Sequence, residues 1–279
     1  RRKIARSNTW NHRAITLQRH LLKQLYPRVS VVLLIYNHTD LSRISLESTL
    51  YRSKYPSLEV VAVDNGSDSA TIKMLQEYKK AKNISLIFNP VNYGFAKGNN
   101  IGMEKSTGEF IVLLNNDVRV TPGWIERLVY HAKVRGVGLV GPVTNSIGNE
   151  AKINIIYDPA NQKDIEDRSA EYTYAHWGQT LKLRNIAAFA WIIPRAIYNK
   201  IGNLDERFGV GLLEDDDYCM RVRRRRFDIV CAEDSFVHHY GGASTTWGSP
   251  EFQLLFNTNK AKFEQKWKTK WIPHQPRKK

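Results

Sequence analysis

Short apolar runs alternate with helical stretches along this chain of 279 residues, and the alternation constrains the fold more than any other feature. The run at residues 29–36 is almost continuously β-branched or aliphatic, which is typical of a strand covered on both faces. Similar runs occupy residues 58–64, 84–89, 110–115 and 137–143, with helical patterns between them at 41–52, 70–80, 95–105 and 122–134. This order predicts an α/β fold with a single doubly wound, mostly parallel sheet and helices on both faces.

The second half of the chain is less regular. Residues 144–185 are polar and show no clear period, so we expect a long loop there, either a functional lid or a disordered segment. An apolar run at 186–193, a helix near 196–201 and a helix that starts at the acidic block 214–217 follow. We therefore expect a main domain at residues 28–248, flanked by basic helical extensions at residues 1–27 and 249–279.

Basic residues are concentrated at the two ends of the chain. The first 28 residues carry eight Lys or Arg and no acid, and residues 255–279 carry eight Lys or Arg and one Glu. These flanks account for the whole net charge of +15, so the residues between them are neutral overall. Such flanks suit an acidic partner, and the alternatives are a phospholipid surface, an anionic substrate, nucleic acid and another domain. A pair of solvated basic ends is an equally good interpretation.

Hydropathy and cysteine usage bear on the compartment. No stretch of 18 apolar residues occurs, so we expect no membrane-spanning helix. Cys219 and Cys231 have no metal-binding spacing and are interpreted as reduced core thiols. We expect a cytoplasmic protein, with peripheral contact at the cytoplasmic face of a membrane as a further hypothesis. The chain begins with Arg1 and has no signal-peptide pattern, and we expect it to be an excerpt of a longer protein.

Two amides and a carboxylate follow the strand at residues 110–114, namely Asn115, Asn116 and Asp117. The strands of a parallel sheet end where its ligand crevice opens. A carboxylate in that position suits a divalent cation that keeps open positions for phosphate oxygens. A plain turn is the alternative interpretation for this segment on its own.

Three further segments are expected at the same crevice. Asp64 ends the second strand and could accept hydrogen bonds from a nucleobase edge or a ribose, or could form an ordinary Asx-turn. Tyr36 could lie flat against a nucleobase or be a core aromatic. The loop at Gly94 opens a helix and lets backbone N–H groups approach phosphate or sugar oxygens. It has neither the G-x-G-x-x-G nor the G-x-x-x-x-G-K-[ST] pattern, which excludes dehydrogenases and P-loop enzymes.

Four adjacent carboxylates, Glu214 to Asp217, begin a helix that ends in arginines. This order suits the helix macrodipole, and at least one acid should have a raised pKa if it is partly buried. An acid that faces the crevice could act as a general base, whereas a solvated acidic loop is the alternative. His239 precedes a Gly-Gly turn; a lone histidine is usually structural, but beside Asp117 it would complete a metal site.

Together these segments resemble the inverting glycosyltransferases of family 2, which have the GT-A fold. The resemblance covers about residues 28–245 and is nearest the branch of rhamnosyltransferases and galactofuranosyltransferases. The matching motifs are Tyr36-Asn37, Asp64-Asn65-Gly66-Ser67, Asn92-x-Gly94-Phe95-Ala96, Asn99-Asn100, Leu114-Asn115-Asn116-Asp117, Leu204-Asp205-Glu206-Arg207-Phe208, Glu214-Asp215-x-Asp217 and His239-x-Gly241-Gly242-x-Ser244.

The resemblance implies a role for each matching residue. Asp215 would deprotonate the acceptor hydroxyl, with Glu214 as its catalytic neighbour. Asp117 and His239 would bind Mg²⁺ or Mn²⁺ at the donor diphosphate. Asp64 would hold the nucleobase and Asn116 the ribose. The implied nucleotide- and donor-binding residues are Tyr36, Asn37, Asp64, Gly94, Asn100 and Asn116. Residues 28–143 would form the nucleotide-binding half and residues 144–248 the acceptor-binding half.

Three positions depart from the pattern of the family. Asn115 stands where many relatives have Asp, which removes a charge and would weaken metal binding. Ala188 stands where many have Gly in the strand that faces the acceptor, and Arg226 replaces a common Gly after the acidic helix.

The implied function is metal-dependent, inverting transfer of a sugar from a UDP- or dTDP-sugar to a hydroxyl of a glycan or lipid-linked acceptor. Trp177 or Trp191 could stack on a sugar ring, although either could equally be core. The alternative is a membrane- or nucleic-acid-docking module on a weakly catalytic GT-A scaffold, for which the basic flanks and Trp267-Lys268-Thr269-Lys270-Trp271 argue. The neutral body argues against nucleic acid. Nucleotidyl transfer would need a glycine- and arginine-rich first loop, which is absent.

Overall fold

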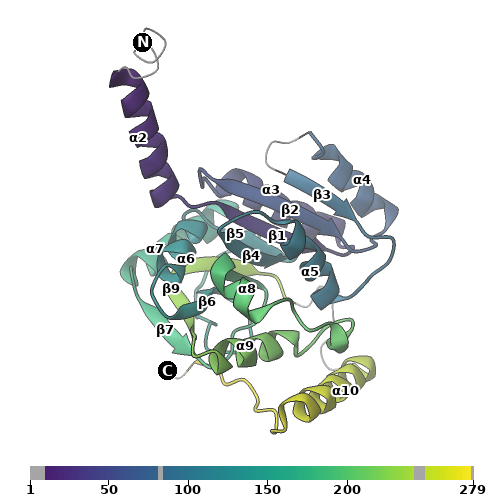
Figure 1. Ribbon diagram of the computed structural model, residues 1–279. Helices are drawn as coiled ribbons and strands as arrows, with labels where there is room; N and C mark the ends of the chain where they lie inside the picture. Colours follow the sequence, from purple (N-terminus) through teal and green to yellow (C-terminus); the bar gives the residue numbers. More distant parts are fainter. Residues whose placement is uncertain (1–9, 81–83, 242–248, 278–279) are drawn as a thin grey trace, which may run out of the picture.

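The computed structural model describes residues 10–80, 84–241 and 249–277 (Figure 1). Within them a nine-stranded sheet has the order β3-β2-β1-β4-β8-β6-β9-β5, with β7 paired to β9 off this path. The strands are β1 (Val29–Ile35), β2 (Leu58–Asp64), β3 (Ile84–Phe88), β4 (Phe110–Asn115), β5 (Val118–Val120), β6 (Val137–Val143), β7 (Thr180–Leu183), β8 (Ala190–Pro194) and β9 (Asp228–His239).

Parallel pairing brings the ends of three strands to one edge of the sheet. β1 pairs in parallel with both β2 and β4, and the register sets Ile35 opposite Asp64 and Leu34 opposite Asn115. β8 lies antiparallel between β4 and β6, and β9 is again parallel to β6. The residues that follow β1, β2 and β4 therefore emerge side by side.

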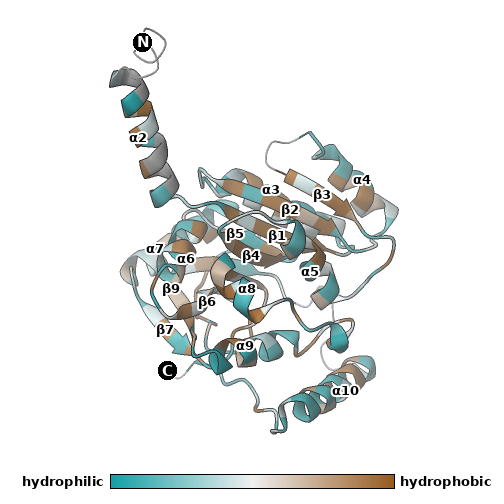
Figure 2. Ribbon diagram, in the orientation of Figure 1, coloured by the Kyte–Doolittle hydropathy of each residue, from teal (hydrophilic) through white to brown (hydrophobic). Residues whose placement is uncertain are grey.

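Helices cover both faces of the sheet, as expected for an α/β fold (Figure 1). In β1, Val31 and Leu33 alternate in direction with Val32 and Leu34, and the two sets belong to separate apolar cores. Figure 2 shows the apolar residues concentrated in the central strands. The helices are α2 (Trp10–Leu25), α3 (Thr39–Arg52), α4 (Ser69–Glu77), α5 (Phe95–Lys105), α6 (Trp124–Ala132), α7 (Gln162–Ala175), α8 (Arg195–Ile201), the short 3₁₀ helix η1 (Glu206–Phe208), α9 (Glu214–Arg224) and α10 (Pro250–Trp267).

The structure corrects one expectation about the second half of the chain. Residues 144–185 are not one long loop, because α7 and β7 lie within them. Asn161 caps α7, since its side chain accepts hydrogen bonds from the N–H groups of Lys163 and Asp164. The buried residues of α7 are Ile165, Ser169 and Thr173. Two of these three are polar, so the helix shows little apolar period in the sequence.

The C-terminal extension packs on the main domain. Ser249 caps α10 by accepting a hydrogen bond from Phe252 N–H. Phe263 and Trp267 of α10 form a small apolar cluster with Phe208 and Leu213. By contrast, α2 projects from the body, as Figure 1 shows.

The burial of the two cysteines and the hydropathy of the helices bear on two expectations from the sequence. Cys219 and Cys231 are both buried and free, which confirms that they are core thiols. Across the part of the chain that the structure describes, no helix is long and apolar enough to cross a membrane.

Candidate active site

The turn after β1 carries Tyr36 and Asn37. Tyr36 is 38% exposed, so its ring is accessible at the edge of the sheet. Asn37 adopts a left-handed backbone with φ 53°. Its N–H donates to Ser67 Oγ at 2.9 Å, and its Oδ1 accepts from Asp68 N–H at 2.9 Å. Asn37 therefore connects the turn after β1 to the turn after β2, and Tyr36 lies beside this junction.

Asp64 ends β2 and is only 1% exposed. Its Oδ2 accepts a long hydrogen bond of 3.4 Å from Ser67 N–H, the contact expected of an Asx-type turn. Its buried Oδ1 has no hydrogen-bond partner among the described residues. A buried acceptor without a partner is costly, and an N–H donor of a ligand would satisfy it.

Asn65 organises the glycine-bearing loop, a role that the sequence did not reveal. Its Nδ2 donates to Asn92 Oδ1 at 2.8 Å and to Gly94 O at 3.2 Å. Its Oδ1 accepts from Asn89 Nδ2 at 3.1 Å and from Tyr93 N–H at 3.2 Å. One buried amide thus fixes the segment 89–94 against the end of β2.

Position 94 requires a glycine because the main chain at Gly209 lies very close to it. Its φ is 83°, and a Cβ there would lie 2.1 Å from the carbonyl oxygen of Gly209. Its N–H donates to Asn92 Oδ1 at 2.8 Å, and Phe95 N–H donates to Val210 O at 3.0 Å. These two N–H groups are used internally, so contact of the loop with phosphate or sugar oxygens stays a prediction for the other N–H groups at the start of α5. The loop contacts the segment that leads to α9.

The side-chain Nδ2 groups of Asn100 and Asn116 also donate hydrogen bonds within the protein. Asn100 donates from Nδ2 to Leu204 O at 3.0 Å and Glu206 Oε1 at 2.9 Å, and its Oδ1 accepts from Leu204 N–H at 2.9 Å. These bonds attach α5 to residues 204–206 and place the amide within the protein. Asn116 Nδ2 donates to Ser42 Oγ at 2.8 Å, which fixes the residue that precedes Asp117.

Asp117 and His239 meet through the pairing of β5 with β9. Val118 lies opposite His239 in that ladder, and Tyr240 N–H donates to Asp117 O at 2.9 Å. Asp117 Oδ1 lies 3.4 Å from His239 Nε2, and both side chains are buried. The predicted encounter of these two residues is therefore present in the structure.

The surroundings of His239 set its orientation. Its Nδ1 lies 2.7 Å from Ser146 O, so this nitrogen carries the proton and Nε2 faces Asp117. Its ring stacks on Phe189 with centroids 5.0 Å apart. Burial lowers the pKa of His239, but the Asp117 carboxylate and the Ser146 carbonyl outweigh it, and the net pKa is raised.

The neighbouring His238 points to the other side of β9 and is structural. Tyr157 Oη lies 2.6 Å from its Nδ1. Burial, and the charges of Arg119 and His239, lower the pKa of His238 to about 4. It stays neutral and hydrogen-bonded, so of the two consecutive histidines only His239 faces the site.

The residues present fit a divalent cation. Asp117 supplies an oxygen and His239 a nitrogen whose other ring nitrogen is oriented by a carbonyl, as is usual for a metal-binding histidine. Over the described residues no group of three or more His, Cys, Asp or Glu forms a closed cage. A two-ligand site is what Mg²⁺ or Mn²⁺ uses when substrate phosphates and water supply the other ligands. Gly242 and Ser244 of the same motif lie outside the described residues.

The acidic block divides into two pairs with different surroundings. Leu212 and Leu213, both with φ 74°, precede α9 in the left-handed conformation and direct its first turn. Burial, then the charges of its neighbours, raises the pKa of Glu214 well above the ordinary value. Burial and Asp216 likewise raise the pKa of Asp215 to about 6. The expectation of a raised pKa in this block is confirmed.

The other two acids are satisfied by the protein. Asp217 is fully buried and accepts from Arg221 Nε at 2.9 Å and from Trp267 Nε1 at 2.9 Å. Asp216 accepts from Trp271 Nε1 at 2.9 Å and lies 2.8 Å from His274 Nε2. Both therefore serve structure, and Asp215 is the half-buried acid that remains for chemistry.

Residues 188 and 189 connect Asp215 to the Asp117–His239 pair. The backbone N–H of Ala188 hydrogen-bonds the Asp215 carboxylate. The next residue, Phe189, stacks on His239 and accepts Asn115 N–H through its carbonyl oxygen at 2.9 Å. The candidate base and the candidate metal ligands thus lie at the same edge of the sheet, on either side of one dipeptide.

The structure also describes three other positions named in the sequence analysis. Trp191 is fully buried in the apolar core, so its proposed stacking on a sugar is wrong. Trp177 is exposed, with Arg127 over its ring at 5.4 Å, so its role stays a prediction. Arg226 has φ 61°, the left-handed conformation that the common glycine would favour, so this departure concerns local backbone.

Comparison with known proteins identifies the family of this chain. The family model described as glycosyl transferase family 2 matches residues 30–202. The O-antigen biosynthesis protein RfbC of Myxococcus xanthus is 25% identical over 235 residues, which are 81% of this chain and 18% of RfbC. The chain spans less than a third of the length of that relative, and 28% of another, the uncharacterized protein y4gI of Sinorhizobium fredii.

Solved structures share the fold at low sequence identity. The mannosyltransferase PcManGT of Pyrobaculum calidifontis, in complex with GDP-Man and Mn²⁺, gives a TM-score of 0.62 at 16% identity over 92% of this chain and 73% of its own. GalNAc-T7 with UDP, GalNAc and Mn²⁺ gives a TM-score of 0.62 at 18% identity over 81% of this chain and 45% of its own. With the family model covering more than half of its residues, this chain belongs to glycosyl transferase family 2 and has the GT-A fold.

Proposed function

We propose that this glycosyltransferase moves a sugar from a UDP- or dTDP-sugar to a hydroxyl of a glycan or lipid-linked acceptor, with inversion at the anomeric carbon and dependence on Mg²⁺ or Mn²⁺. One observation carries the proposal. A half-buried carboxylate with a raised pKa, Asp215, lies across residues 188–189 from the carboxylate–imidazole pair Asp117–His239.

The donor side of the site is built by the turns after β1 and β2. Tyr36 offers an exposed ring for a nucleobase, and Asp64 offers a buried oxygen in need of an N–H donor. Uracil and thymine both carry a ring N–H that could donate to this oxygen, as guanine also does, and we propose UDP or dTDP by resemblance to the family. The solved relative GalNAc-T7 has UDP bound, which supports the same choice.

Asp117 and His239 would hold the metal ion. When bound, a divalent cation supplies positive charge to the diphosphate as the leaving group gains negative charge. The chain itself holds His239 Nε2 toward Asp117 through the Ser146 carbonyl, so no ring rotation is needed before a ligand binds.

Asp215 would take the proton of the acceptor hydroxyl. A pKa of about 6 leaves the carboxylate ionised near neutral pH while keeping it more basic than an ordinary Asp. Attack by the deprotonating hydroxyl on the face opposite the leaving diphosphate forms the new C–O bond as the old one breaks. A single displacement inverts the anomeric centre and needs no covalent sugar–enzyme intermediate.

The type of acceptor is proposed from a relative. RfbC is named for O-antigen biosynthesis, which supports a glycan or lipid-linked acceptor and a role in cell-envelope polysaccharide synthesis. A second candidate function is docking to an acidic surface, because α2 exposes Trp10, Leu17 and Leu25 on a basic helix. Binding to phosphatidylglycerol vesicles that is lost when residues 1–27 are deleted would support docking.

The function is tested by screening nucleotide sugars for thermal stabilisation of the protein with and without Mn²⁺. A tight donor stabilises by RT ln(1 + [L]/Kd), so the true donor should stand out against free nucleoside monophosphates. NMR of the product formed from that donor should show the opposite anomeric configuration. Retention of configuration would overturn the inverting mechanism, and stabilisation by no nucleotide sugar would overturn the whole proposal.

A further inference from the structure

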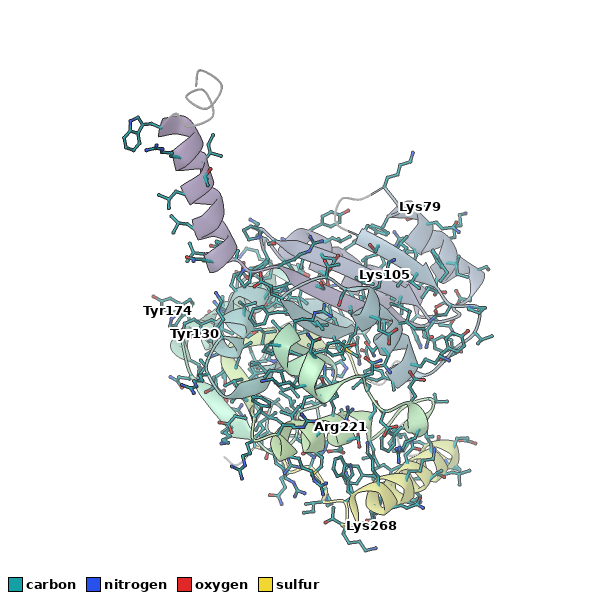
Figure 3. All side chains as sticks on the ribbon, in the orientation of Figure 1. Lys79, Lys105, Tyr130, Tyr174, Arg221 and Lys268 are labelled. Carbon is teal, nitrogen blue, oxygen red and sulfur yellow. The ribbon has the colours of Figure 1, made fainter. Side chains whose placement is uncertain are left out.

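After α10 the chain returns along α9 toward β7, as the yellow trace in Figure 1 shows. Along this return, which we call the C-terminal strap (residues 268–277), side chains contact the main domain repeatedly. Arg277 ends the strap with two bonds to Glu233, at 2.9 and 2.8 Å, and one to Glu150 O at 2.8 Å. In Figure 3, Lys268 marks the start of the strap, beyond the end of α10, and Arg221 lies on α9. The strap is therefore fixed at its far end.

Between these points the strap contacts the first turn of α9. Asp216 is 2% exposed and its carboxylate has three partners. Its Oδ2 accepts from Trp271 Nε1 at 2.9 Å, and its Oδ1 lies 2.8 Å from His274 Nε2 and also accepts from Asn185 Nδ2. Two of these partners come from the strap, so the Asp216 carboxylate is held chiefly by residues far along the chain.

We propose that His274 is a positioning residue for the general base: through its ion pair with Asp216 it fixes the first turn of α9 and supplies the positive charge beside Asp215. The inference rests on the proposed function, in which Asp215 is the base. Asp215 Oδ1 accepts from Asp216 N–H at 2.8 Å, so any movement of Asp216 moves Asp215 with it.

The charges around His274 support a cationic side chain. Burial lowers the pKa of His274, but the bond to Asp216 and the attraction of Asp215 and Glu150 outweigh burial and raise it to about 9. Conversely, burial and the charge of Asp216 raise the pKa of Asp215, and the charge of His274 lowers it. The pKa of Glu214 is likewise raised, by burial and by the charges of Asp215, Asp216 and Asp217. Without a cation here, three acids of one helical turn would face one another.

Helix α10, which precedes the strap, also contacts the loop before α9. Asn259 of α10 is fully buried, and its Nδ2 donates to the carbonyl oxygens of Phe208, Gly211 and Leu212 at 2.7, 2.7 and 3.2 Å. Those carbonyls belong to the loop that holds Leu212 and Leu213 in the left-handed conformation. The contacts that hold the first turn of α9 and those that hold the loop before it thus both come from the C-terminal extension.

The test compares His274→Gln, which keeps a hydrogen-bond donor but removes the charge, with His274→Arg, which keeps both. The pKa of Asp215, followed by ¹³C NMR of the carboxyl carbon, should rise by about one unit in His274→Gln and stay near the wild-type value in His274→Arg. The acid limb of kcat/KM should move to higher pH by the same amount. Equal Asp215 pKa values in wild type and His274→Gln would overturn the proposal.

A matched control removes a charge from the same strap without approaching α9. In the part of the chain that the structure describes, Lys270 pairs with Glu264 at 3.2 Å, and its side chain is 89% exposed. Lys270→Gln should leave the Asp215 pKa and the acid limb unchanged. A shift as large as that of His274→Gln would mean that the net charge of the strap, and not the His274–Asp216 pair, sets the base.

The inference can also be tested if the variant does not fold or if no sugar donor is found. If His274→Gln does not fold, histidine NMR of the wild-type protein decides: a His274 pKa near 9 supports the ion pair, and an ordinary value of about 6.5 overturns it. Because both NMR titrations need no substrate, a failure to find any sugar donor would overturn the proposed function and leave the role of His274 to be judged separately.

Discussion

Asp117 Oδ1 and His239 Nε2 lie 3.4 Å apart, at the point where β5 pairs with the end of β9. Ligand atoms bound to one cation at ~2.1 Å lie about 3.0 to 3.4 Å from each other, so this separation already suits a shared ion. The pairing of the two strands, and not a flexible loop, sets the distance.

Asp117→Ala should weaken donor and metal binding together, because one of the two proposed protein ligands of the metal is removed. We expect the Kd for the nucleotide sugar in Mn²⁺ to rise by roughly 10–100-fold or more, and the Mn²⁺ dependence of binding to disappear. Isothermal calorimetry with and without Mn²⁺ measures both effects.

The matched control for that experiment is Asp167→Ala, which removes a carboxylate from the solvent side of α7, where Asp167 pairs with Lys163. Its donor affinity should equal that of the wild type. Unchanged Mn²⁺-dependent binding in Asp117→Ala would remove the metal-site assignment.

Asp215→Asn should lower kcat by about 10²–10⁴-fold while donor binding stays nearly intact, because the change removes a base without removing a donor contact. Steady-state kinetics and calorimetry on the same preparation separate the two. Glu214→Gln is the comparison: burial keeps the pKa of Glu214 well above its ordinary value, so a neutral amide should retain most of the activity. Near wild-type turnover in Asp215→Asn would assign the base elsewhere.

The pH dependence of kcat/KM should show an acid limb near pH 6. The pKa of Asp215 is raised to about 6, so the active carboxylate is lost as the pH falls through that value and is fully present above it. His239 also has a raised pKa, and its protonated form cannot bind a metal ion.

Measuring the profile at several Mn²⁺ concentrations separates these two groups. Saturating Mn²⁺ should displace the His239 proton and move that part of the limb to lower pH, but should leave the Asp215 part in place. A limb that vanishes entirely at high Mn²⁺ would contradict the role of Asp215.

Trp267→Ala should destabilise the protein by about 3–5 kcal/mol, because it removes a buried aromatic and leaves Asp217 without its indole donor. Chemical unfolding measures this change. Lys268→Ala, at the exposed end of α10, is the control and should leave the free energy of unfolding nearly unchanged. Equal stability of Trp267→Ala and wild type would show that the C-terminal extension is not part of the folded unit.

The strands that the sequence predicted best are those whose buried interiors are continuous apolar runs. β2 and β6 begin and end at the predicted residues, because their apolar runs stop at an acid or at a change of composition. β9 was missed because its twelve residues include Glu233, Asp234 and His238. These polar groups are buried only because partners from elsewhere satisfy them: His131 lies 2.8 Å from Asp234, and Arg277 pairs with Glu233.

The same reasoning explains which parts of the site were found. Asp64, Asp117 and Asp215 could be predicted because each lies at or next to an end of a regular element. The supports supplied by Asn65, Asn259 and His274 could not, since each depends on a contact between segments distant in sequence. Asn100 was expected at the donor, but its amide is used to hold residues 204–206.

The contact of Gly94 with Gly209 has a consequence for how this enzyme can diversify. The loop at Gly94, on the proposed nucleotide side, and the loop at Gly209, which leads to the proposed base, touch through main-chain atoms. A Cβ at Gly94 would lie 2.1 Å from the Gly209 carbonyl oxygen. Neither loop can be remodelled alone, because no side chain between them can absorb a change in spacing. A change in donor preference, in natural relatives or by engineering, should therefore be accompanied by a change in how the acceptor is bound.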